Sequence, residues 1–244
     1  MPDTANPSIS LGVDSLTVFF PCHNEEGNIR QVYESAAKAL ENLSLDYELI
    51  FVDDGSTDQT PQIADAIAAA DPRVRVVHHP TNLGYGAALQ SGFRAATKTL
   101  VFYTDGDGQF DLNELPPLLP LMTQCDIVSC FRLNRQDNWI RNFNAWCWTR
   151  LVCFLFHLKI KDINCAYKLY KRGIFDRFEM RSTGALINTE IFARAVRRGY
   201  AIVQVGVHHF PRARGRQTGA NLRVIFRAFR ELAQLYREIK HDVK

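Results

Sequence analysis

Short apolar runs alternate with amphipathic stretches along the first half of the chain. The apolar runs are rich in Val, Ile, Phe and Tyr, and they span residues 16–21, 47–52, 74–78, 99–104 and 126–131. Helical periodicity separates them at residues 28–43 and 58–70, and a further helix is expected to open near Gly84. Strands that alternate with helices in this way predict an α/β fold, with a mostly parallel, twisted sheet flanked by helices.

The pattern is looser in the second half of the chain. Three prolines within residues 112–122 predict a short or broken helix. Beyond them we expect a polar loop at 132–138, strands at 166–170 and 201–208, and helices at 139–158, 185–198 and 220–240. Because no linker interrupts this series, we predict a single domain over residues 15–244, preceded by a flexible tail over residues 1–14.

Four polar clusters each directly follow a predicted strand. Their sequences are PCHNEE from Pro21, DDGSTD from Asp53, NLGYG from Asn82 and DGDGQ from Asp105. The carboxyl ends of strands in an open α/β sheet form the edge where ligands bind. Carboxylates gathered at that edge require a cation, and a cation there suits a diphosphate, so the cargo predicted from these clusters is a nucleotide-diphosphate.

The cluster Asp105-x-Asp107-x-Gln109 has the chemistry of a metal site. Gly106 and Gly108 permit the turn that lets these side chains converge, and hard oxygen ligands suit Mg²⁺ or Mn²⁺. A calcium-binding EF-hand loop is excluded because Pro116 occupies the position of its final Glu. The G-x-G at Gly84 does not predict nicotinamide binding, since Leu89 replaces the third glycine of that fingerprint.

Charge divides the chain into two unlike halves. Residues 1–129 contain 6 Lys and Arg against 18 Asp and Glu, whereas residues 130–244 contain 23 against 8. The two halves could simply attract each other, or the basic half could handle phosphates or an anionic membrane. The basic segment 209–219 is punctuated by Gly215 and Gly219, which favours a flexible lid over a diphosphate.

Taken together, these clusters resemble family 2 glycosyltransferases with the GT-A nucleotide-sugar fold, and within them the dolichyl-phosphate mannose synthase-like branch of polyprenyl-phosphate glycosyltransferases. The resemblance runs from about residue 17 to residue 229. Segment 162–172 is similar to the family's D-x-x-x-G-F/Y-R-L-Y-R motif, with Ala166 and Lys168 in place of Gly and Arg. Residues 187–190 resemble the family's acidic position near the acceptor.

The resemblance implies inverting, metal-dependent transfer of a sugar from a GDP-mannose or UDP-glucose type of donor to a polyprenyl or dolichyl phosphate. It implies Mg²⁺ or Mn²⁺ at Asp105, Asp107 and Gln109. The expected catalytic and acceptor-side residues are Asp107, Arg132, Arg141 and Glu190. The expected donor-binding residues are Pro21, Asn24, Glu25, Asp53, Asp54, Gly84, Asp105, Arg212 and Arg214.

Six cysteines without C-x-x-C spacing indicate free thiols in a reducing compartment, so we expect a cytoplasmic protein. Because the implied acceptor is a lipid, we also expect peripheral association with the cytoplasmic face of a membrane and a membrane subunit as a partner. Aromatic residues near Arg141 and Arg150 suit either the core or a membrane interface. These are Trp139, Trp146, Trp148, Phe154 and Phe156. Nucleic acid is not expected as a partner, since no nucleic-acid module accompanies the basic charge.

Three alternative functions stay open. The acceptor could be a sugar hydroxyl in polysaccharide synthesis, which requires a carboxylate base, and Glu190 would then be the leading candidate. The chain could instead be a non-catalytic nucleotide-sugar-binding subunit. A nucleotidyltransferase would also use acids and a metal, and would release pyrophosphate from a nucleoside triphosphate.

Overall fold

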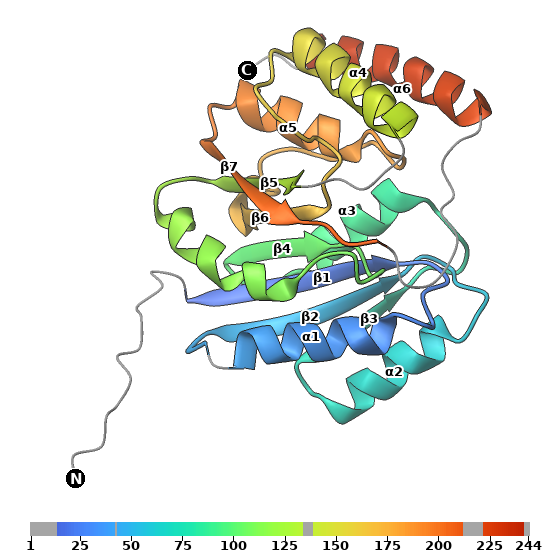
Figure 1. Cartoon of the computed structure of the whole chain (residues 1–244), viewed down its shortest axis with the longest axis vertical. Coiled ribbons are helices and arrows are strands. Elements are labelled where there is room, and N and C mark those ends of the chain that lie inside the picture. The colour runs from blue at the N-terminus through green and yellow to red at the C-terminus, as the bar shows by residue number, and fades with distance from the viewer. Residues whose placement is uncertain (1–13, 42, 134–138, 212–221, 242–244) are drawn as a thin grey trace.

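The computed structural model describes residues 14–41, 43–133, 139–211 and 222–241, with side chains throughout except at 139–144, 222–228 and 241. Within these residues, seven strands form one sheet in the order β3-β2-β1-β4-β6-β5-β7 (Figure 1). The strands are β1 (Ser15–Cys22), β2 (Asp46–Asp53), β3 (Val74–His78), β4 (Leu100–Thr104), β5 (Ile127–Leu133), β6 (Tyr167–Lys171) and β7 (Ile202–His208). The α-helices are α1 (Ile29–Glu41), α2 (Thr60–Ala70), α3 (Tyr85–Ala95), α4 (Trp139–Phe156), α5 (Ile187–Arg197) and α6 (Leu222–His241).

The sheet separates two hydrophobic cores. Side chains that alternate along a strand point to opposite faces, so Phe20 packs in one core and its neighbour Phe19 in the other. The first core is completed by α1, α2 and the short 3₁₀ helices η1 (Leu112–Glu114) and η2 (Pro116–Thr123). The second is completed by α3, α4, α5 and α6. The mostly parallel sheet flanked by helices is therefore confirmed.

The strand order places a ligand-binding edge beside β1. Strands β2 and β4 lie on either side of β1 and are both parallel to it. The strand order therefore reverses beside β1, since β2 and β3 follow on one side and β4 begins the other. Ligands bind at the carboxyl ends of strands at such a reversal. Strand β6 lies antiparallel between β4 and β5, which the sequence did not predict. As a result, the residues that precede β6 lie at the same edge as the residues that follow β4.

Most predicted elements are present, with small differences in their bounds. The proline-rich segment forms the two 3₁₀ helices instead of an α-helix, as its prolines predict. Helix α2 begins at Thr60, and its N-cap position is held by Gln59, not by Asp58 as predicted. Asp58 still accepts from the Thr60 amide at 2.9 Å. Strand β5 continues to Leu133, past the predicted loop start at 132. The predicted tail, apart from Asp14, and loop residues 134–138 lie outside the described residues.

Candidate active site

The loops that follow β1 and β2 are bound to each other by side-chain hydrogen bonds. Asn24, in a left-handed conformation with φ of 57°, accepts from the Thr57 amide at 2.8 Å, and its own amide donates to Ser56 Oγ at 3.0 Å. The Glu25 amide donates to Thr60 Oγ1 at 2.7 Å, and the buried Glu25 carboxylate accepts from Asn28 at 2.7 Å. Pro21 lies at the end of β1, and its carbonyl accepts from the Gly106 amide at 3.3 Å. Three of the expected donor-binding residues, Pro21, Asn24 and Glu25, therefore lie at the end of β1 and on the loop after it, which hydrogen bonds hold against the loop after β2.

Asp53 ends β2 as a buried carboxylate with defined partners. Its Oδ1 accepts from the Ser56 amide at 3.0 Å, and its Oδ2 lies 2.9 Å from His78 Nδ1. Burial alone would raise the pKa of Asp53, but the hydrogen bonds from Ser56 and His78 outweigh burial and lower it. Asp53 is therefore ionised at neutral pH, which suits hydrogen bonding to a base or ribose.

His78 is expected to make the stability of the protein depend on pH. The hydrogen bond to Asp53 raises the pKa of His78 above 6.5, against the effect of burial and with help from Asp65 at 3.1 Å. This stabilisation is complete below about pH 6.5 and is lost as pH rises through the folded-state pKa. We expect urea midpoints of the wild type to fall from about pH 6 to about pH 8.5 more steeply than those of His78→Gln. A control variant, His157→Gln, should keep the wild-type slope, and equal slopes in all three proteins would contradict this role.

Asp54, which directly follows β2, holds the loop that precedes α3. Its Oδ1 accepts from the Leu83 amide at 2.8 Å and lies 2.7 Å from His79 Nδ1, and its Oδ2 accepts from the Gly84 amide at 2.9 Å. The sequence assigned Asp54 and Gly84 to donor binding. In the structure the Asp54 carboxylate is buried and positions backbone, so any effect of Asp54 on a donor passes through Gly84 and its neighbours.

The start of α3 packs closely against a distant segment. A Cβ atom on Gly86 would lie 2.5 Å from the Ser182 carbonyl oxygen, so only glycine allows this approach. The Thr183 carbonyl accepts from the Ala87 amide at 3.2 Å, and the Ser182 carbonyl accepts from Gln90 at 2.9 Å. The 182–184 segment is thereby fixed beside the loop that follows β3.

Glu190 holds that same segment from the other side. Its side chain is 0% exposed, and its carboxylate accepts from the amides of Arg181 at 3.1 Å and Ser182 at 2.7 Å. Arg194, also buried, donates to Glu190 Oε1 at 2.9 Å. Sequence analysis placed Glu190 on the catalytic side as the candidate base. In the structure its carboxylate binds backbone amides and a buried guanidinium, and its expected catalytic role stays a prediction.

Asp105 follows β4 at the same edge, and its carboxylate is buried. Among the residues that the structure describes, its Oδ1 has no hydrogen-bond partner. Burial, together with the charge of Asp107, raises the pKa of Asp105 to about 7, although the Tyr85 hydroxyl, Lys168 and Arg132 oppose the rise. The carboxylates of Asp105 and Asp107 fit a divalent cation, which would bind Asp105 Oδ1 and stabilise both carboxylates in their ionised form.

The donor set fits a cation that is completed by a substrate. Within the described residues, no group of three or more His, Cys, Asp or Glu side chains has the geometry of a metal site. Mg²⁺ is commonly held by one or two carboxylates together with substrate phosphates and water. Asp105 and Asp107 would hold such an ion, with its remaining ligands supplied by a diphosphate and water.

Gln109 connects this loop to the residues that follow β7. Its side-chain amide donates to the Phe210 carbonyl at 2.9 Å, and its own carbonyl accepts from the Phe210 amide at 2.9 Å. Asp107 Oδ1 accepts from the Gln109 amide at 3.2 Å. Gln109 thus anchors the start of the predicted lid, while its expected role as a metal ligand stays a prediction.

The buried lysine Lys168 interacts electrostatically with Asp105. Lys168 is 0% exposed and donates to the Tyr103 hydroxyl at 3.2 Å and to the Cys165 carbonyl, and Tyr103 donates to Asn188 at 2.5 Å. Burial lowers the pKa of Lys168 to about 8, and the charge of Asp105 acts in the opposite direction. The sequence assigned no site role to Lys168, Tyr103 or Asn188, although the motif at 162–172 pointed to this segment.

The expected acceptor arginines are only partly described. Arg132 forms a two-point ion pair with Asp162, with N–O distances of 2.7 and 3.0 Å, and its charge is felt at Asp105. Arg132 therefore lies at the predicted edge with an acidic partner that the sequence analysis did not foresee. The Arg141 side chain and residues Arg212 and Arg214 lie outside the described residues.

Comparison with solved structures supports the same fold. Glucosyl-3-phosphoglycerate synthase from Mycobacterium tuberculosis, in complex with UDP, has a TM-score of 0.68 and 21% identity over 93% of this chain and 80% of that chain. The same enzyme with Mn²⁺, UDP and glucosyl-3-phosphoglycerate has a TM-score of 0.65 and 20% identity over 96% and 82%. Mannosyl-3-phosphoglycerate synthase from Rubrobacter xylanophilus has a TM-score of 0.71 and 17% identity over 96% and 77%.

These comparisons confirm the predicted GT-A architecture, and the relatives bound to Mn²⁺ agree with the metal expected from the sequence. The finer prediction of the dolichyl-phosphate mannose synthase-like branch is not confirmed by them. Residues 17–179, well over half of the chain, match the family model described as Glycosyl transferase family 2. The chain therefore belongs to glycosyl transferase family 2 and is a glycosyltransferase.

Proposed function

We propose that this protein transfers a hexosyl group, with inversion and with a divalent metal, from a nucleotide-diphosphate-sugar to the phosphate of a polyprenyl phosphate. The observation that carries the proposal is the buried Asp105 carboxylate, whose Oδ1 has no hydrogen-bond partner within the described residues and whose pKa the neighbouring Asp107 raises, at the reversal of the strand order. A bound Mg²⁺ or Mn²⁺ would neutralise the donor diphosphate and stabilise the departing nucleoside diphosphate. The relatives solved with UDP and Mn²⁺ support this donor class.

The wall built from the loops after β1 and β2 suits the nucleoside. Asp53 offers an ionised carboxylate, and Pro21, Asn24 and Glu25 lie on the neighbouring loop that Ser56 and Thr57 hold in place. The start of α3 at Gly84 brings backbone close to this wall. Arg212 and Arg214 are proposed to close over the diphosphate.

The burial of Glu190 supports a phosphate acceptor. A hydroxyl acceptor requires a base, and the carboxylate expected in that role is buried and fully engaged. A phosphate monoester is largely ionised at neutral pH, with a second pKa of about 6, and needs no base. In the proposed step, an acceptor phosphate oxygen forms a bond to the anomeric carbon as the bond from that carbon to the donor diphosphate breaks.

A second candidate acceptor is a small phosphorylated hydroxy acid. The relatives include glucosyl- and mannosyl-3-phosphoglycerate synthases, which favour an acceptor of the phosphoglycerate type. Such an acceptor could share the arginine contacts proposed here, but its phosphate would remain a monoester after sugar transfer to a hydroxyl.

Arg132→Ala is expected to weaken use of the acceptor more than binding of the donor. Removing a charge-assisted hydrogen bond costs about 1.5–3 kcal/mol, or roughly ten- to a hundredfold in acceptor-dependent rate. The rate at limiting acceptor should be compared with the donor dissociation constant, with Arg172→Ala, at an exposed ion pair on η3 (Arg172–Ile174), as a control. A loss of donor affinity alone would show that Arg132 serves the donor phosphate.

The face formed by α4 and α6 suits contact with a bilayer. The two helices pack side by side through Trp148 with Phe229 and Phe156 with Tyr236 (Figure 1). Trp148 and Phe156 therefore serve packing, against the interface alternative for these two residues. The exposed side chains described on the two helices are aromatic, cationic or uncharged, whereas the acidic Glu231 and Glu238 are half-buried. The exposed side chains include Trp146, Arg150, Phe154, Phe229, Arg230 and Arg237.

This α4/α6 face is proposed to contact anionic lipid. Trp146 is 55% exposed and Phe154 78% exposed, and Arg150 lies over the Trp146 ring at 5.4 Å. Aromatic rings with adjacent cations favour the headgroup region, whereas contact with a second copy would bring like charges together. In the described part of the chain, none of the helices is long and apolar enough to cross a membrane.

Vesicle binding is expected to depend on these exposed aromatics. The double variant Trp146→Ser with Phe154→Ser should lose most binding to anionic vesicles, and wild-type binding should weaken as salt rises. Leu83→Ser, which removes an exposed apolar side chain elsewhere, is the matched control for co-sedimentation. Equal binding by all three proteins would remove the α4/α6 face from the proposal.

The function is tested by pairing a donor screen with product analysis. GDP-mannose, UDP-glucose and their free nucleotides should be tested for thermal stabilisation with Mn²⁺, followed by turnover with labelled donor and a mixture of a polyprenyl phosphate and phosphoglycerate. Label in the lipid phase supports the proposal. Label in a water-soluble phosphate ester supports the second candidate. Binding without turnover indicates a non-catalytic subunit, and pyrophosphate release from a nucleoside triphosphate indicates a nucleotidyltransferase.

A further inference from the structure

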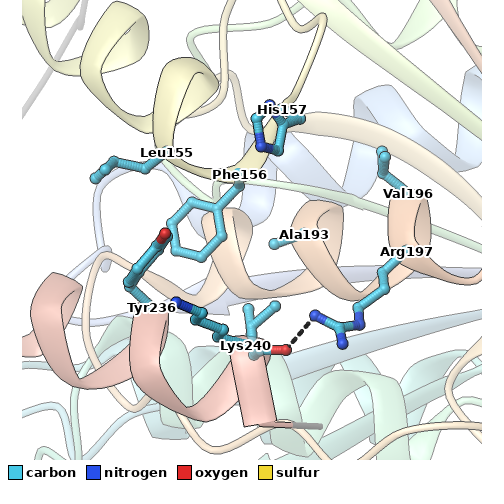
Figure 2. A pocket seen from close by; sticks show the side chains of 9 residues that line it. Leu155, Phe156, His157, Ala193, Val196, Arg197, Tyr236 and Lys240 are labelled. Atoms are coloured by element: carbon cyan, nitrogen blue, oxygen red, sulfur yellow. Dashed lines mark hydrogen bonds between the residues drawn. The ribbon is translucent and has the colours of Figure 1, made fainter. Parts of the chain in front are cut away.

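A cavity lies where the C-terminal ends of α4, α5 and α6 meet, and none of the residues assigned to sugar transfer lines it. Its volume is about 320 Å³. Figure 2 shows the Phe156 ring, Ala193 and Tyr236 facing one another across it. Leu155, Val196 and Ile239 complete an apolar lining. Ligand cavities commonly have this size and character, with a few polar groups that fix orientation.

Three of the polar side chains that line this cavity are basic, and the fourth is Tyr236 with its hydroxyl. His157, Arg197 and Lys240 line it, and no acidic residue does. Within the described residues, His157 and Lys240 make no side-chain hydrogen bond or ion pair, and Arg197 makes one, from Nη1 to the Ile239 carbonyl at 2.5 Å (Figure 2). His157 also has φ of 55°, a left-handed conformation that is uncommon outside glycine.

Capping of the three helix ends does not account for these side chains. Basic residues often bind the last carbonyls of a helix. Here the Cys153 carbonyl of α4 accepts from the Leu158 amide at 2.9 Å, and the Val196 carbonyl of α5 accepts from the Gly199 amide at 3.0 Å. Arg197 alone acts as a cap, on α6, and its guanidinium retains further donors.

We propose that this cavity binds a small amphiphilic anion, meaning a carboxylate or phosphate ester with an aliphatic or aromatic body. The apolar body would lie against Phe156, Ala193 and Tyr236. The anionic head would lie at the basic rim formed by His157, Arg197 and Lys240. Both parts are required, because burial of the body supplies most of the affinity and the rim selects the charge.

Calorimetry on the full chain tests this proposal with octanoate as the probe. Octanoate should bind, and octanamide, which has the same body without the charge, should bind roughly tenfold more weakly or worse. Inorganic phosphate alone should give no measurable heat. Equal affinity for octanoate and octanamide, equal affinity for inorganic phosphate, or no binding of octanoate would each overturn the proposal.

Variants locate the site. Ala193→Phe fills the cavity and should abolish octanoate binding, and Val196→Phe, at an exposed position on the cavity wall, occludes it without entering the core. Lys240→Gln should weaken binding about two- to fivefold, as expected for an exposed charge. Lys159→Gln, exposed and outside the cavity lining, should leave affinity unchanged. Wild-type affinity in a folded Val196→Phe protein, or an equal loss in Lys159→Gln, would overturn the assignment.

Discussion

Asp107→Asn is expected to lower turnover by roughly 10²-fold or more while leaving the fold intact. The substitution keeps the shape of the side chain but removes one of the two negative charges that fit the cation. It should also lower the pKa of Asp105, because the charge of Asp107 is one cause of its elevation. Turnover should be measured across a range of Mn²⁺ concentrations, and folding should be checked by circular dichroism.

A matched control separates this effect from a general loss of charge. Glu34→Gln removes an exposed carboxylate on α1 that makes no hydrogen bond within the described residues, so turnover and metal dependence should stay at the wild-type values. Near-normal turnover of Asp107→Asn at every Mn²⁺ concentration would remove Asp107 from the mechanism.

Glu190→Gln is expected to destabilise the fold, because it removes the negative charge that pairs with the buried Arg194 at 2.9 Å. Breaking a buried ion pair from one side costs about 3–5 kcal/mol. The urea midpoint should fall accordingly, and donor affinity should fall with it, since Glu190 holds the segment that packs on the start of α3. Equilibrium unfolding and donor titration at low temperature measure both effects.

The outcome for Glu190 also distinguishes the two acceptor classes. In the folded fraction of Glu190→Gln, the pH profile of turnover should match that of the wild type. Glu179→Gln, at an exposed ion pair with Arg181, should change neither stability nor turnover. If Glu190 were a general base, the folded fraction of its variant would lose roughly 10²–10⁴-fold in turnover, and a hydroxyl acceptor would be favoured.

The first half of the fold was predictable because its rules are local. The apolar runs of β1, β2 and β4 are each followed by acidic residues and glycine, so strand ends and ligand edge coincide in the sequence. Asp53 and Asp105 lie at that edge for this reason. The antiparallel insertion of β6 was not predictable, since period-two patterning gives a strand but not its direction or its neighbours.

What the sequence could not separate was positioning from chemistry. Asp54 and Glu190 read as acids beside a ligand, yet the structure uses both to bind backbone amides of loops that are distant in sequence. The sequence indicates only that Lys168 is a basic residue in a strand, whereas the pairing of β6 with β4 brings its charge close enough to act on Asp105. Such roles depend on long-range contacts, which residue spacing does not encode.

The central claim is that an acceptor phosphate oxygen receives the sugar at the edge defined by Asp105 and Asp107. The most direct measurement is phosphorus NMR of the products formed from a nucleotide-sugar and Mg²⁺, which is not paramagnetic, with a polyprenyl phosphate and, in a parallel reaction, with phosphoglycerate. A phosphodiester signal that resists phosphatase, formed from the polyprenyl phosphate by the wild type and not by Asp107→Asn, is the predicted result. A product formed only from phosphoglycerate, as a phosphatase-sensitive monoester, would place the sugar on a hydroxyl and contradict the account.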